Sequence, residues 1–139
     1  MTVVPDTNVV LQGLAAGHPF EPILDAAMAG AFVWAISTDV LMEYEEVLTR
    51  VCGRVRWAKL ALVMDLTDAD CGTLLRVTPY FHFRAVPADR DDDKFADCAI
   101  AADGNWIVTE DRHFNALIGA GYKPQPITPE EFIRRFLRV

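Results

Sequence analysis

The chain has 139 residues, of which 52% are hydrophobic and 24% are charged, and its net charge at pH 7 is −7. This length and composition predict a single globular domain over residues 1–139 and exclude a disordered chain. No apolar run reaches the ~20 residues that a membrane-spanning helix needs, and the first residues lack the pattern of a signal peptide. The odd set of cysteines, Cys52, Cys71 and Cys98, has no metal-ligand spacing. We therefore expect a reduced, cytoplasmic protein with no membrane partner.

The acidic balance argues against a broad nucleic-acid-binding surface, because phosphate binding normally needs a basic stripe. The basic residues form two modest groups: Arg50, Arg54, Arg56 and Lys59, and Arg134, Arg135 and Arg138. Each group is either a guide for a phosphate backbone or an ordinary solvated helix face.

Short apolar runs alternate with stretches of helical periodicity along the chain. In chain order we expect strand Thr2–Pro5, helix Pro22–Ala29, strand Phe32–Ile36, helix Asp39–Val51, helices Trp57–Leu66 and Asp70–Val77, strand Tyr80–Val86, helix Asp92–Ala102, strand Trp106–Thr109, helix His113–Ala120 and a last helix that Thr128 caps and Pro129 begins. Ser37, Thr38 or Asp39 caps the helix at Asp39–Val51. Strands that alternate with helices predict an α/β fold, with a mostly parallel sheet sandwiched between helices.

Acidic residues stand where such a fold gathers them: Asp6, Glu43, Asp93 and Asp111. Asp6 and Asp111 follow two of the expected strands, and functional residues of an open parallel sheet collect past the carboxyl ends of its strands. Clustered carboxylates repel one another unless a divalent cation neutralises them. Asp97 lies four residues after Asp93, on the same helical face, and adds to this repulsion. The pattern predicts a magnesium or manganese site.

Each acidic residue also has an explanation without chemistry. Asp6 and Asp111 fit helix or turn caps, and Asp93 fits the amino-terminal end of a helix dipole. Glu43 and Glu45 lie on opposite borders of one apolar stripe, and helical geometry does not choose between them. Three other polar residues lie near these acids. Asn8 is suited to hold the Asp6 carboxylate or a water, and Thr109 is suited to orient Asp111. His113 is either a substrate contact beside Asp111 or a surface helix residue, and the second interpretation is favoured.

With these residues placed, the chain resembles PIN-domain proteins, specifically the VapC-like toxins of toxin–antitoxin pairs. The resemblance runs from PDTNVVL through STDVLMEYEEVL to DDDKFADCAIAADGNWIVTEDRHF. It implies a three-layer α/β/α sandwich and a metal-dependent ribonuclease that hydrolyses RNA. It also implies a protein antitoxin and a homodimer.

The same resemblance assigns roles to individual residues. The catalytic acids would be Asp6, Glu43, Asp93 and Asp111, and Mg²⁺ or Mn²⁺ would bind to Asp6, Asp93, Asp97 and Asp111, with Asn8 and Thr109 in support. Two residues depart from the family pattern. Pro5 replaces an apolar strand residue and is expected to shorten the first strand, and Glu110 adds negative charge beside Asp111.

Two other functions stay open. A phosphatase of the haloacid-dehalogenase type also begins with an Asp after its first strand, but it needs a second Asp where this chain has Asn8. A catalytically silent PIN-like binding module fits the net charge of −7 and Glu110. Retained partner binding without RNA cleavage would distinguish this module from a nuclease.

Overall fold

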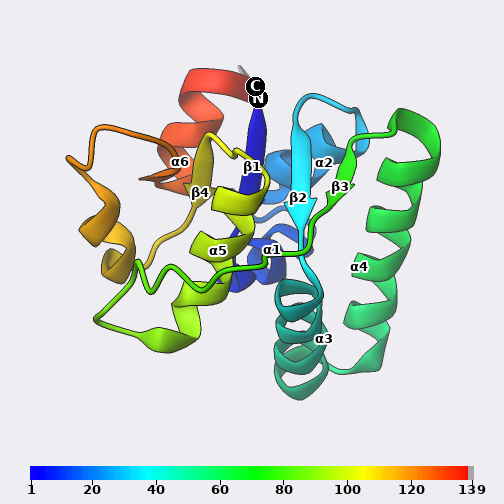
Figure 1. Cartoon of the computed structure of the whole chain (residues 1–139). Helices are drawn as coiled ribbons and strands as arrows, with labels where there is room; N and C mark the ends of the chain where they lie inside the picture. Colours follow the sequence, from blue (N-terminus) through cyan, green and yellow to red (C-terminus); the bar gives the residue numbers. More distant parts are fainter. Residues whose placement is uncertain (138–139) are drawn as a thin grey trace.

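Five parallel strands form a single sheet at the centre of the protein (Figure 1). Their order is β3-β2-β1-β4-β5, and the strands span Thr2–Pro5 (β1), Val33–Ile36 (β2), Leu74–Arg76 (β3), Trp106–Val108 (β4) and Gln125–Ile127 (β5). The computed structural model describes residues 1–137, so Arg138 of the second basic group and Val139, at the end of the expected domain, lie outside the described residues. The expected α/β class and parallel sheet are confirmed.

Helices cover both faces of the sheet and extend beyond its carboxyl edge. They span Thr7–Gly13 (α1), Glu21–Met28 (α2), Thr38–Cys52 (α3), Arg54–Leu66 (α4), Asp93–Ala101 (α5) and Pro129–Phe132 (α6). In Figure 1, α5 lies in front of the sheet, whereas α1, α2 and α6 lie behind it. The core between these layers is aromatic at its centre, where Trp34, Tyr44, Phe95, Phe114 and Phe132 are fully buried. Among residues 1–137, no helix combines the length and apolar character that crossing a bilayer requires.

Side-chain caps fix where the helices begin. Of the three candidates for α3, Ser37 is the cap, and its hydroxyl accepts a hydrogen bond from the Val40 amide. Thr128 caps α6 and Pro129 is its first residue, as the sequence predicts. Pro5 does not shorten β1, because it still lies in register with Val108 of β4.

Two expected elements are wrong. A helix was expected over Asp70–Val77, but Gly72 adopts a left-handed conformation (φ 64°) that ends the preceding helical turn, and β3 follows and pairs with β2. A strand was expected over Tyr80–Val86. Because β3 occupies the place beside β2, this segment instead runs outside the sheet, across α5 (Figure 1). Its aromatic residues Tyr80, Phe81 and Phe83 are exposed.

Tyr44 connects the core to the carboxyl end of β1. Its ring is fully buried, and its hydroxyl donates a hydrogen bond to the carbonyl of Pro5, the last residue of β1. This bond holds α3 against the strand end and thereby positions its neighbour Glu43.

The Tyr44→Phe variant tests this connection. We expect the free energy of unfolding to fall by about 1 kcal/mol, because a buried hydrogen bond is lost while the ring still fills its site. Urea unfolding followed by circular dichroism measures the change. Tyr122→Phe is the matched control, since Tyr122 is 66% exposed. Equal stability of the two variants would contradict the role of Tyr44.

Candidate metal centre

Asp6 lies at the carboxyl end of β1 and caps α1. Its Oδ1 accepts a hydrogen bond from the Thr7 amide (2.7 Å), and its Oδ2 accepts one from the Thr109 hydroxyl (2.7 Å). Only 7% of Asp6 is exposed. Burial raises its pKa to about 6 although both hydrogen bonds lower it, and the negative charges of Glu43 and Asp111 add to the rise. Asp6 is therefore a fixed carboxylate that resists ionisation without a cation.

Two threonines connect Asp6 to the neighbouring acids, Thr7 through its amide and its hydroxyl and Thr109 through its hydroxyl. The Thr7 hydroxyl donates a hydrogen bond to Glu43 Oε2 on α3. On the other side, the Thr109 hydroxyl accepts one from the Asp111 amide (2.9 Å). The structure thus brings together Asp6, Glu43 and Asp111, three of the four acids that the sequence groups.

A lysine partly neutralises this group. Lys94 on α5 donates from Nζ to Glu43 Oε1 at 2.9 Å. Of the two glutamates that border the apolar stripe of α3, Glu43 is the one at the acidic group. It is half-buried there, whereas Glu45 is exposed. Glu43 therefore faces the acidic group and already has one cationic partner.

Asp92, rather than Asp93, lies beside Asp111 and Asp6. It ends a single helical turn, η2 (Arg90–Asp92), directly before α5. Burial is the main reason that the pKa of Asp92 is raised to about 7. The charge of Asp111, a hydrogen bond with Asp111 and the charges of Asp6 and Asp89 add to the rise. The side chain of Asp92 is 13% exposed. Asp92 thus takes the fourth place of the acidic group.

Asp93 and Asp97 form a separate pair on another face of α5. Asp93 accepts hydrogen bonds from the Val86 amide (2.9 Å) and from Arg90 (3.2 Å). Asp97 accepts one from the Phe83 amide (3.0 Å) and contacts His82 Nδ1 at 3.2 Å. The four-residue spacing does place these two acids on one face, but that face holds the segment that crosses α5.

The two expected supporting residues differ in their surroundings. Thr109 is 4% exposed and bridges Asp6 and Asp111, which makes it a central residue of the group. Asn8 is exposed on the first turn of α1 and makes no side-chain hydrogen bond to any residue in 1–137. The amide of Thr7, not the side chain of Asn8, holds the Asp6 carboxylate.

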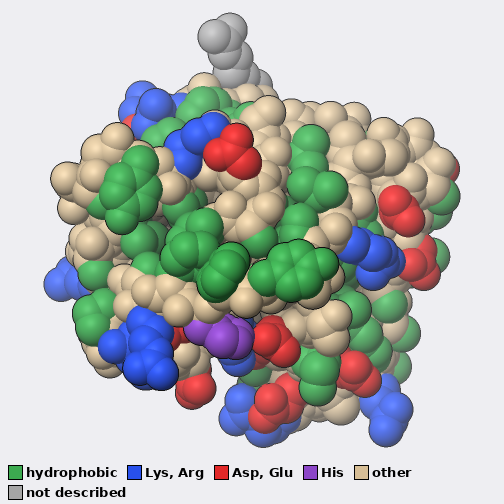
Figure 2. All heavy atoms as spheres, viewed as in Figure 1, with side chains coloured by type: hydrophobic (Ala, Val, Ile, Leu, Met, Phe, Trp, Pro, Cys, Tyr) green, Lys and Arg blue, Asp and Glu red, His purple; other side chains and the backbone are tan. Residues whose placement is uncertain are grey.

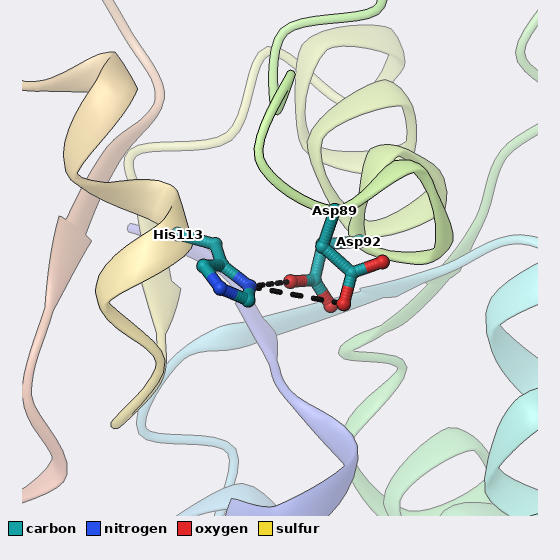
Figure 3. Close-up of side chains that lie close together, drawn as sticks. All are labelled: Asp89, Asp92 and His113. Carbon is teal, nitrogen blue, oxygen red and sulfur yellow. Dashed lines mark hydrogen bonds and ion pairs between the residues drawn. The ribbon is translucent and has the colours of Figure 1, made fainter.

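His113 joins the group from the helical turn η3 (Arg112–Leu117) and was not expected there. Figure 3 shows its ring pointing toward Asp89 and Asp92, which come from the segment before α5. One ligand atom from each of these three residues lies within 4.8 Å of the others, an arrangement that could hold a metal ion. The only feature of the sequence that pointed to this role is that His113 follows the capping residue Asp111 by two positions.

Together, carboxylates at the carboxyl edge of a five-stranded parallel sheet define an α/β domain with a candidate carboxylate metal site. A family model described as the PIN domain matches residues 2–113. The protein belongs to the PIN domain family, whose members are typically metal-dependent nucleases. Comparisons with curated proteins and with solved structures gave no match.

The raised pKa values predict how stability depends on pH when no metal is bound. Asp6 (about 6) and Asp92 (about 7) hold protons more tightly in the folded than in the unfolded protein, where the value is 3.8. The folded state therefore binds more protons between about pH 4 and 7, and stability falls as pH rises through that range. In chelator, we expect a lower melting temperature at pH 8 than at pH 5.5 and a smaller fall in Asp6→Asn. Thermal unfolding curves of both proteins would contradict this if their pH slopes were equal.

Proposed function

We propose that the protein is a metal-dependent endoribonuclease that hydrolyses RNA phosphodiester bonds. The observation that carries this proposal is the hydrogen-bonded series Glu43–Thr7–Asp6–Thr109–Asp111 in a PIN domain, with Asp92 beside it. Buried, mutually repelling carboxylates of this kind are stable as anions only beside a cation. Their oxygen donors suit Mg²⁺ or Mn²⁺.

In this proposal each acid has a separate task. Asp6, Asp92 and Asp111 hold the cation, and the Thr109 hydroxyl fixes the orientation of Asp6. Glu43 accepts a proton from the attacking water, and Thr7 and Lys94 hold its two oxygens in place. When bound, a divalent cation lowers the pKa of a water and neutralises charge that develops on the phosphate.

RNA cleavage by neighbouring variants tests the assignment of these acids. We expect Asp6→Asn and Asp92→Asn to lower cleavage of a mixed structured-RNA pool by ~100-fold or more in Mg²⁺ or Mn²⁺. Asp93→Asn should retain most activity, because Asp93 is occupied with Val86 and Arg90.

The adjacent pair Asp92 and Asp93 makes this test a matched one. Loss of activity in Asp93→Asn with full activity in Asp92→Asn would contradict the assignment. Cleavage that persists in chelator would contradict the role of a metal.

An exposed aromatic strip next to the centre fits single-stranded RNA. It consists of Tyr80, Phe81 and Phe83, which are 87%, 71% and 51% exposed. Figure 2 shows hydrophobic side chains gathered across the middle of the face that carries this segment. Aromatic surfaces stack on unpaired bases without regard to sequence. The segment continues to Asp89, so bases bound here would lie beside the acidic group.

The double variant Tyr80→Ala/Phe81→Ala tests this strip. In an Asp6→Asn background, which prevents turnover, we expect affinity for a fluorescent single-stranded RNA to fall at least tenfold, since each stacked base contributes about 1–3 kcal/mol. Fluorescence anisotropy measures binding. Tyr122→Ala, which removes another exposed aromatic ring, should leave affinity unchanged. A similar loss in both variants would argue against specific stacking.

The proposal extends to a role as a VapC-like toxin in the cytoplasm. An antitoxin segment with a basic side chain would neutralise the acidic group in the same way as Lys94 neutralises Glu43. We also propose a homodimer. Apolar side chains exposed on α4, Val55, Leu62 and Leu66, offer a contact face for the second copy.

A catalytically silent binding module is the second candidate, and the Lys94–Glu43 ion pair favours it, because a lysine already occupies one carboxylate. When no RNA substrate is cleaved, calorimetric titration with Mn²⁺ shows whether the acidic group binds a cation, and a folded protein that binds none is not the proposed metal-dependent nuclease. A silent module that keeps the acidic group would bind Mn²⁺ and a partner without turnover.

A further inference from the structure

His113 brings one ring nitrogen close to three carboxylates. Its Nδ1 lies 3.1 Å from Asp111 Oδ1, 3.3 Å from Asp92 Oδ2 and 3.7 Å from Asp89 Oδ2 (Figure 3 shows the last two residues). A ring nitrogen carries either one N–H or one lone pair, so it can bond well to only one of them. One imidazolium also falls short of the negative charge of three aspartates. As an ordinary ion pair, the group is under-neutralised.

The spacing of these atoms fits ligands that share one cation. Neighbouring ligands of an octahedral ion with bonds of about 2.1 Å lie about 3 Å apart. The distances from Nδ1 to the Asp111 and Asp92 oxygens are near this value, and the Asp89 oxygen is only slightly farther away. The ligand atoms of Asp89, Asp92 and His113 lie within 4.8 Å of one another and Asp111 lies beside His113, so movements of these side chains would bring them around one ion.

Backbone contacts already hold these side chains in position. Asp111 accepts a hydrogen bond from the His113 amide at 2.8 Å, and Asp89 accepts one from the Asp91 amide at 3.0 Å. His113 is followed by Phe114, which is fully buried and anchors η3 in the core. The candidate metal ligands therefore come from two segments, the one before α5 and η3, and their side chains are short and held by the backbone.

A nitrogen donor changes which cation the site prefers. Mg²⁺ favours oxygen ligands, whereas imidazole suits first-row transition ions, of which Mn²⁺ also accepts carboxylates. We propose that His113 Nδ1, together with Asp89, is a further ligand of the cation that Asp6, Asp92 and Asp111 hold, and that it makes this centre select Mn²⁺ over Mg²⁺. The inference rests on the proposed metal centre and adds two residues, Asp89 and His113, that an all-carboxylate site with Asp93 and Asp97 omits.

Pulsed electron paramagnetic resonance of the full chain with Mn²⁺ alone tests this directly. We expect ¹⁴N coupling of a histidine to Mn²⁺ in the wild type and its loss in His113→Gln. His82→Gln is the matched control, because the His82 Nδ1 also lies beside an aspartate, 3.2 Å from Asp97 Oδ2, but in the separate pair on α5. The control variant should keep the coupling.

A competition experiment measures the selectivity. The Mg²⁺ concentration that displaces half of the bound Mn²⁺ should fall about tenfold in His113→Asp, which replaces the nitrogen by an oxygen ligand. This second variant keeps a ligand at the position, so the result does not depend on the folding of His113→Gln.

The outcomes separate this inference from the proposed function. Mn²⁺ that binds without ¹⁴N coupling overturns the role of His113 and leaves a carboxylate centre and a nuclease intact. Coupling that disappears in His82→Gln instead moves the ion to the Asp93–Asp97 pair and also overturns the inference. Absence of Mn²⁺ binding by folded wild-type protein overturns both proposals.

Discussion

Repulsion between carboxylates is the constraint on which the rest of this structure depends. Asp6, Glu43, Asp92 and Asp111 approach one another at the carboxyl edge of the sheet, and burial raises the pKa values of Asp6 and Asp92. Charge alone would separate these side chains. They stay together because an apolar core fixes the helices and strands that carry them. Packing of the core therefore outweighs the repulsion between the carboxylates.

The connection between core and edge is made residue by residue. On α3, buried Tyr44 holds the end of β1 while its neighbour Glu43 reaches Thr7. On α5, Phe95 is fully buried and its neighbour Lys94 reaches Glu43. In each pair an aromatic ring fixes the backbone and the adjacent side chain enters the acidic group. The side chains of the group are therefore held by the rigid core. The Thr7 amide and the Thr109 hydroxyl hold Asp6 in the same way.

Local rules could predict the parts of the site that lie at ends of clear elements. Asp6 and Asp111 follow apolar strands, and Glu43 lies on the border of a strongly periodic helix. The choice of Asp92 over Asp93 was beyond these rules, because one residue changes direction by about 100° on a helix, and α5 begins one residue later than expected. The contact between Asp89 and His113 joins segments that only the tertiary fold brings together.

The run of three aspartates at the start of α5, Asp91 to Asp93, does more than place negative charge at the end of a helix dipole. Asp92 turns toward the carboxylate group, whereas Asp93, with Asp97, holds the segment that carries the aromatic strip and then Asp89. Substitution at Asp92 would therefore act directly on the centre, whereas substitution at Asp93 would loosen the segment that it holds and leave most of the centre in place. A loss of activity alone would not identify a ligand, and only a measurement on the bound cation separates a residue that contacts it from one that positions its neighbours.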